Sequence, residues 1–259
     1  MCLDYEKMKK SRTFLQYEKP LLTVMIDADH PDGIKRLIDV SVPEGAEAIG
    51  MQFCRLKPEY RNKDVYRDLF AYTDLPIYAT NYRNHVSNVG KSDDQIAAEL
   101  VELAECGATL CDVLGDCFDA CEGELTMQAE AVKKQMQLID TLHDKGAEVL
   151  MSSHICKFTP AERVLALAYE HQKRGADICK IVTWAGNMEQ QIENLRIINL
   201  LKENLSIPFL FLAGGECRIV RRMGGLFGCC MYLCTPESPA PATLSQPPLR
   251  DVKLIRDLI

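Results

Sequence analysis

The sequence lacks any long block of basic residues, because no run of its 30 Lys and Arg is longer than a pair, such as Lys-Lys or Arg-Arg. With a formal net charge of -7 it offers little to a phosphate backbone or an anionic membrane. No apolar run approaches the length that spans a bilayer, and the start is charged where a secretory signal would be apolar. We therefore expect a cytoplasmic protein that binds neither nucleic acid nor membrane.

Metal-binding cysteine motifs are also missing. None of the 12 cysteines forms a Cys-x-x-Cys pair, and the close spacings include Cys117/Cys121 and the adjacent Cys229/Cys230. Cys111 and Cys179, like the adjacent pair, stand inside apolar runs, where Cys behaves as a small hydrophobe. We expect reduced thiols in the core and no metal site, since cytosolic thiols are normally kept reduced.

Short apolar segments rich in branched residues recur after a polar lead-in over residues 1–19, and longer amphipathic segments separate them. The glycine-rich turn of a doubly wound dinucleotide-binding sheet does not follow the first segment. Eight strands in 259 residues suit one α/β barrel, so we predict a single-domain (β/α)8 TIM barrel over residues 1–259. The expected strands are Leu21–Ile26, Ala46–Phe53, Leu75–Thr80, Ala108–Leu114, Ala147–Ser152, Ala176–Thr183, Ile207–Ala213 and Leu226–Leu233.

Capping residues mark the expected helices between these strands. The clearest start is Thr159–Glu162, where Thr159 would cap, Pro160 would take the first helical position and Gly175 would stop the helix. Arg218 stands at another expected helix start. Further helices are expected over Ile34–Val40, Ile96–Glu105, Thr126–Lys145 and Met188–Asn204. Gly107 follows the second of these, and Asn187 precedes the last.

Function in such a barrel lies at the carboxyl ends of the strands, which makes Lys180 informative. It interrupts an apolar strand, and with a period of two it shares a face with Ile178 and Val182. If that face is the barrel interior, desolvation favours a neutral amine, which can attack a carbonyl as a Schiff-base nucleophile. The alternative is a buried structural lysine paired with Asp112 or Asp177.

His154 ends the neighbouring strand, at the same end of the barrel as Lys180. Iminium chemistry needs a group that takes and returns protons, and an imidazole beside the amine suits that task. The alternative is that His154 has no catalytic role and is a loop residue whose ring nitrogens are hydrogen-bonded within the protein. After the seventh strand, Gly214-Gly215 with Arg218 predicts an anion pocket, the alternative being a glycine turn with a surface arginine.

The second half of the chain resembles the type I 3-dehydroquinate dehydratases. The resemblance is carried by Met151–His154 with Phe158–Pro160, by Gly175–Ile181, and by Arg218 followed by Phe227-Gly228. It implies a (β/α)8 barrel without metal or organic cofactor, in which Lys180 forms an imine with a ketone and His154 moves protons as water is lost. It also implies substrate contacts from Arg218, Gln246, Arg83, Gln52 and Asp112.

The first half departs from the family's pattern at several positions. Gln52 and Cys54 stand where the family has a glutamate and an arginine, unless Arg55 substitutes by a local shift. Ser87 and Leu114 stand where it has two glutamates, and Ala242–Ser245 replaces Ser-Ala-Pro-Gly before Gln246. The reaction type is therefore better supported than the substrate, because loosely held hydroxyls position a ring poorly.

Three hypotheses follow for a chain expected to bind a small keto or hydroxy carboxylate. The first is a lyase of the shikimate pathway, and thus of aromatic amino acid biosynthesis, that converts 3-dehydroquinate to 3-dehydroshikimate by loss of water. The second is another lysine Schiff-base lyase or a class I aldolase for a different keto acid, and the third a non-catalytic ligand-binding barrel. The resemblance also implies a homodimer, and the proline-rich stretch Pro236–Pro248 is expected to form a lid loop.

Overall fold

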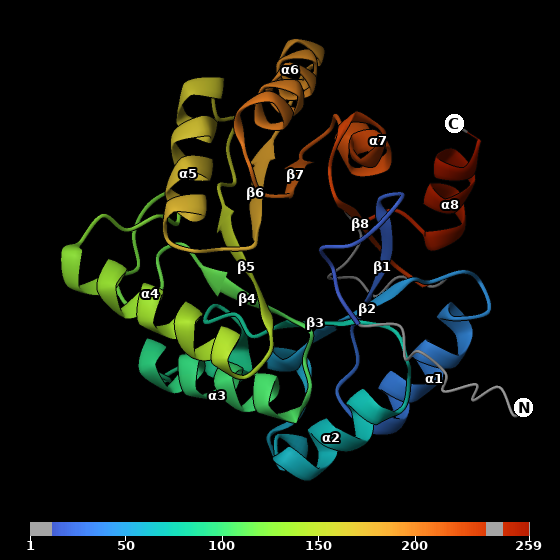
Figure 1. Ribbon diagram of the computed structural model, residues 1–259. Coiled ribbons are helices and arrows are strands. Elements are labelled where there is room, and N and C mark those ends of the chain that lie inside the picture. The colour runs from blue at the N-terminus through green and yellow to red at the C-terminus, as the bar shows by residue number, and fades with distance from the viewer. Residues whose placement is uncertain (1–11, 237–245, 259) are drawn as a thin grey trace, which may run out of the picture.

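The structure, a computed structural model, describes residues 12–236 and 246–258. Eight parallel strands form one sheet in the order β7-β6-β5-β4-β3-β2-β1-β8, and the helices lie outside the ring of strands (Figure 1). The ring is nearly closed, because Cys230 N at the start of β8 donates to Phe209 O at the start of β7 at 2.9 Å. The strands are β1 (Leu21–Ile26), β2 (Ala48–Gln52), β3 (Ile77–Thr80), β4 (Leu110–Leu114), β5 (Glu148–His154), β6 (Ile178–Trp184), β7 (Phe209–Gly214) and β8 (Met231–Cys234). The predicted (β/α)8 barrel is confirmed.

Helices follow the strands in alternation, and short 3-10 turns η1 (Phe53–Arg55), η2 (Pro58–Tyr60) and η3 (Val86–Asn88) lie in the loops after β2 and β3. Asn187 caps α6 by accepting from Gln190 N, and Gly107 ends α3 with a φ of 111°, both as the sequence indicates. The α-helices are α1 (Pro31–Ser41), α2 (Lys63–Ala71), α3 (Asp93–Cys106), α4 (Ala129–Asp144), α5 (Ala161–Lys173), α6 (Met188–Asn204), α7 (Ile219–Phe227) and α8 (Leu249–Asp257).

Two local predictions were wrong. Thr159 does not cap α5: Pro160 holds the N-cap position in an extended conformation, and the Thr159 hydroxyl turns back to Lys157 O at 3.2 Å. The eighth strand begins at Met231 and not at Leu226, because Leu226 and Phe227 form the last turn of α7, which Gly228 ends with a φ of 128°. Two short amphipathic helices, α2 and α8, were not predicted from the sequence.

The barrel interior is filled by alternate residues of each strand, as the period of two requires. Met25, Tyr78, Leu150, Ile178 and Leu210 belong to this inner cluster, and all are buried. The thiols Cys111, Cys179, Cys229 and Cys230 are buried as expected. No helix in the described ranges is long and apolar enough to cross a membrane.

Candidate active site

Lys180 projects into the barrel and is only 3% exposed, which confirms the predicted burial. Its Nζ donates to Tyr82 Oη at 2.8 Å, to Tyr78 Oη at 3.0 Å and to Asp112 Oδ2 at 3.0 Å. A lysine ammonium has three protons, and here each has an oxygen acceptor. One of these acceptors is a carboxylate, so the arrangement suits an ammonium in which every proton makes a hydrogen bond.

Asp112 is the buried counter-ion of this amine. Besides Lys180, the carboxylate accepts from Tyr82 Oη at 2.6 Å, from Tyr78 Oη and from Ser152 Oγ. Burial opposes its ionisation, but the Lys180 charge and these hydrogen bonds lower the pKa of Asp112 on balance. The pairing that the sequence left open is with Asp112, since Asp177 instead accepts from Val149 N at 2.7 Å.

His154 ends β5 and is register partner to Val182, just beyond the Ser152 and Lys180 pair. Its Nδ1 lies 2.8 Å from Glu124 Oε2, and its backbone N donates to the same oxygen at 2.7 Å. A carboxylate only accepts, so Nδ1 carries a proton, and in a neutral imidazole of this tautomer the lone pair is on Nε2. The Tyr82 ring packs edge-on against the imidazole, with centroids 5.3 Å apart. His154 thus lies against the side chain that contacts Lys180.

Glu124 was missed by sequence reasoning, because it stands in the loop after β4 with no motif around it. It adopts a φ of 46°, in the left-handed region that a non-glycine residue seldom enters. The surroundings hold it there: Ser153 Oγ donates to Glu124 O at 2.6 Å, and Glu124 N donates to Cys121 O at 3.2 Å. Such constrained backbone is common at functional sites.

Behind Glu124, a buried chain of hydrogen bonds fixes the Ser153 hydroxyl. The Ser153 hydroxyl donates its one proton to Glu124 O. His171 Nε2, 3.0 Å from Ser153 Oγ, is therefore the donor of that second hydrogen bond. The neutral ring then accepts at Nδ1 from the Cys179 thiol, at 3.4 Å. Burial, aided by the Arg174 charge, lowers the pKa of His171 to about 3, consistent with a neutral imidazole.

Arg174, only 2% exposed, holds the two ends of the loop that carries Glu124. Its guanidinium donates to Gly115 O at 3.2 Å and to Thr126 O at 2.6 Å, and also to Gln135 Oε1 at 2.7 Å. Arg174 therefore joins the two ends of the loop that contains Glu124, the partner of His154.

Arg83, predicted to contact substrate, pairs with two acidic side chains of the protein. Its Nη2 lies 3.2 Å from Asp93 Oδ2 and 3.1 Å from Asp116 Oδ1, and donates to Asp116 O at 3.0 Å. Arg55, the alternative to Cys54, pairs with Asp27 at 3.3 Å. Both guanidinium groups thus have acidic partners within the protein.

Cys54 and Ser87, two of the positions that depart from the family's pattern, are in contact. Ser87 Oγ donates to Cys54 O, and Arg61 donates to both, at 2.7 Å to Cys54 O and 2.5 Å to Ser87 Oγ. These positions join the loops after β2 and β3. Gln52 lies at the end of β2, register partner to Thr80, and Leu114 ends β4.

Arg218, at the N-cap of α7, is exposed, and its Nε donates to Gly215 O at 2.8 Å. Gly215 has a φ of 92°, and a Cβ there would lie 2.5 Å from Ala185 O, so the glycine is required by the turn. The glycine turn with a surface arginine, the alternative to an anion pocket, is thus present, and Arg218 donates to its backbone.

The expected lid over Pro236–Pro248 lies largely outside the described residues. Its two ends meet, because Thr235 N donates to Pro247 O and Leu249 N donates to Thr235 O, both at 2.9 Å. Gln246 is partly buried, and its Oε1 is a buried atom without a hydrogen-bond partner.

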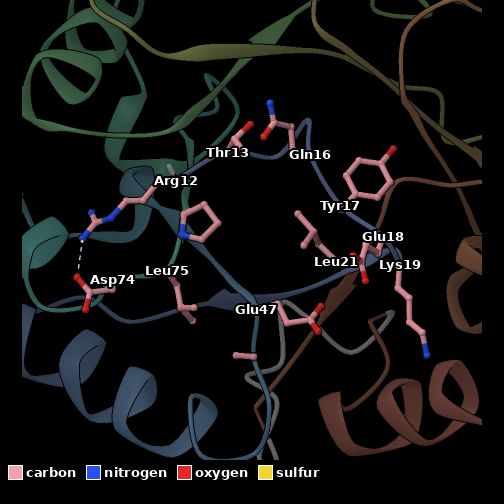
Figure 2. A pocket seen from close by; sticks show the side chains of 12 residues that line it. Arg12, Thr13, Gln16, Tyr17, Glu18, Lys19, Leu21, Glu47, Asp74 and Leu75 are labelled. Atoms are coloured by element: carbon pink, nitrogen blue, oxygen red, sulfur yellow. Dashed lines mark ion pairs between the residues drawn. The ribbon is translucent and has the colours of Figure 1, made fainter. Parts of the chain in front are cut away.

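A cavity of about 360 Å³ opens beside the site, lined by Arg83, Leu114, Asp116, Glu124 and neighbouring residues of the loop after β4. Another, of about 740 Å³, lies at the opposite end of the barrel, between the segment Arg12–Lys19 and the starts of β1, β2 and β3 (Figure 2). The first is the candidate substrate side, because barrel chemistry lies at the carboxyl ends of the strands. Among the described residues, no group of three or more His, Cys, Asp or Glu gathers as a metal site.

The chain is similar in sequence to known 3-dehydroquinate dehydratases. It is 34% identical to the 3-dehydroquinate dehydratase of Alkaliphilus oremlandii over 126 residues, 47% of this chain and 48% of that protein. It is 28% identical to that of Syntrophotalea carbinolica over 165 residues, 62% of this chain and 60% of that protein. The chain thus spans about half the length of these curated relatives.

Solved structures agree on the fold. The type I 3-dehydroquinate dehydratase of Clostridium difficile superposes with a TM-score of 0.76, at 19% identity and over 94% of both chains. The enzyme of Geobacillus kaustophilus gives 0.77, at 15% identity and over 95% of both chains. The model of the type I 3-dehydroquinase family matches residues 57–258. The chain therefore belongs to the type I 3-dehydroquinase family.

Proposed function

We propose that this protein is a Schiff-base dehydratase that converts 3-dehydroquinate to 3-dehydroshikimate by loss of water. The observation that carries the proposal is the buried Lys180 amine on β6, with His154 one strand away at the same end of the barrel. Family membership supports the substrate, and the His154 tautomer set by Glu124 supports a base at Nε2. The reaction needs no metal or organic cofactor.

In this reaction Lys180 attacks the ketone and water is expelled to leave an iminium, which acidifies the adjacent carbon. His154 takes a proton from that carbon, hydroxide leaves from the next carbon with a proton, and a carbon-carbon double bond forms. Water then hydrolyses the imine and frees the amine. Arg218 and Gln246 are the proposed contacts for the substrate's carboxylate and hydroxyl groups, and Gln52 the proposed contact at the end of β2.

The compartment we infer is the cytoplasm, where thiols stay reduced. All 11 cysteines among the described residues are free of disulfides, which supports that inference. The working unit we propose is a homodimer, which size-exclusion chromatography with light scattering would test.

A spectrophotometric assay for the conjugated enone tests the activity, and borohydride trapping followed by peptide mass spectrometry tests the imine. We expect 3-dehydroquinate to give enone absorbance and to mark Lys180. Lys180→Met should abolish both signals, while His154→Asn should abolish turnover and leave the imine. Absence of enone at high enzyme concentration would refute the substrate.

A second candidate, a Schiff-base lyase or class I aldolase for another keto acid, is favoured by one observation. Arg83 is neutralised by Asp93 and Asp116, and Leu114 and Ser87 replace acidic groups, so the site offers fewer charged contacts to a polyol ring. A panel of keto acids in the trapping assay separates the two. Marking of Lys180 by another keto acid, without marking by 3-dehydroquinate, would favour this candidate.

A further inference from the structure

Two phenols share the amine and its counter-ion. Tyr82 Oη accepts from Lys180 Nζ at 2.8 Å and donates to Asp112 Oδ2 at 2.6 Å, so it links the amine to the carboxylate. Tyr78 makes the same two bonds from within β3. Nothing in the sequence pattern predicted either tyrosine.

The two tyrosines differ in what else can reach them. Tyr78 is 0% exposed, and Asp112 has no exposed side-chain surface, so neither can touch a ligand. Tyr82 follows β3 at the carboxyl end, is partly exposed, and packs against His154. Of these three partners of Lys180, Tyr82 is therefore the one that an incoming ketone can meet.

We propose that Tyr82 is a further catalytic residue, which with Asp112 forms a relay that takes a proton from the Lys180 ammonium and returns it to the ketone oxygen. The proposal rests on the Schiff-base chemistry of the proposed function. It explains how an amine held as an ammonium becomes a nucleophile without a base from solvent.

The relay starts from the ion pair of the Lys180 ammonium and the Asp112 carboxylate. Nζ passes one proton to Tyr82 Oη while Tyr82 passes its own to Asp112, leaving a neutral amine and a neutral carboxylic acid. The nitrogen lone pair then bonds to the ketone carbon, and the carbon-oxygen π pair moves to oxygen. Asp112 returns its proton through Tyr82 to that oxygen, and the relay next carries one proton from nitrogen to the same oxygen. Water leaves, the iminium keeps one proton on nitrogen, and Asp112 is again a carboxylate.

The electrostatics of Tyr82 suit a donor. Burial and the neighbouring Asp112 carboxylate raise the pKa of Tyr82 well above its usual value, so the phenol stays protonated. A protonated phenol can both receive a proton from nitrogen and release one toward oxygen. This agrees with the geometry but is secondary to it.

Rapid-quench borohydride trapping tests the relay, with glyoxylate and with 3-dehydroquinate as separate carbonyl probes. In Tyr82→Phe we expect the rate of imine formation to fall about 100-fold, the scale of general acid-base catalysis, while the final trapped fraction stays at the wild-type level. Tyr78→Phe, the matched control, should change the rate by less than about 5-fold.

Three results would overturn the proposal: an unchanged rate in Tyr82→Phe, equal losses in both variants, or a trapped fraction that falls together with the rate. The last would mean that Tyr82 only places Lys180. A second measurement needs no variant, since proton relay predicts slower imine formation of the wild type in deuterium oxide, and equal rates would refute it. If glyoxylate is trapped and 3-dehydroquinate is not, the proposed substrate fails while the relay remains under test.

Discussion

Replacing Glu124 by glutamine removes the carboxylate that holds His154 but keeps the size of the side chain. The carboxylate makes two bonds to His154, at 2.8 Å to Nδ1 and 2.7 Å to the backbone N, in a half-buried position. Hydrogen bonds to a charged group contribute about 1.5 to 3 kcal/mol each. An amide can also turn its NH2 toward Nδ1, which would place the ring proton on Nε2 and remove the base.

Because the amide retains one acceptor oxygen, we expect a loss of about 2 kcal/mol, which corresponds to a fall in kcat of roughly 30-fold. Imine formation should persist, since Glu124 does not contact Lys180. The assays are enone formation from 3-dehydroquinate and borohydride trapping, together with nitrogen-15 NMR of the imidazole, which reports the tautomer directly. Wild-type His154 should carry its proton on Nδ1.

Glu130→Gln is the control, because Glu130 is an exposed glutamate in the first turn of α4, the helix that follows this loop. We expect it to leave kcat and the His154 tautomer unchanged. A wild-type ring protonated on Nε2 would refute the reasoning, as would a Glu124→Gln variant that keeps both kcat and the wild-type tautomer.

Two further predictions concern stability. The pKa of His171 is lowered by burial to about 3, below its unfolded value of 6.5, so the stability that the neutral ring provides is complete above pH 6.5 and is lost as the pH falls toward 3. At about 1.4 kcal/mol per pH unit, acidification from pH 6.5 to 4.5 should lower the free energy of unfolding by about 3 kcal/mol in the wild type but not in His171→Gln. Urea unfolding at a series of pH values measures this, and the same pH dependence in both proteins would contradict it. Gly215→Ala should cost about 2 to 3 kcal/mol, because the new Cβ would meet Ala185 O at 2.5 Å. Gly146→Ala, at a similar φ of 82° with open space around it, should cost about 1 kcal/mol, and equal losses in thermal or urea unfolding would show that the contact is unimportant.

The amino-acid sequence by itself determined the order of the elements and the end of the barrel that carries the chemistry. Branched apolar runs and end signals such as Asn187 and Gly107 act within a few residues, so strands and helices could be placed from local pattern. In a parallel barrel the carboxyl ends of all strands share one edge, which is why His154 and Lys180 could be assigned to one site.

The tertiary structure alone decided the partners of those residues. Asp112 and Tyr82 meet Lys180 from 68 and 98 positions away, and Glu124 meets His154 from a loop without a motif. The acidic partners of Arg83, Asp93 and Asp116, come from other parts of the chain as well. Periodicity fixes which face a side chain occupies, whereas its partner across the barrel depends on strand register and on the path of the loops, which no local pattern encodes. Hence the structure alone showed that the Lys180 amine is enclosed by a carboxylate and two phenols.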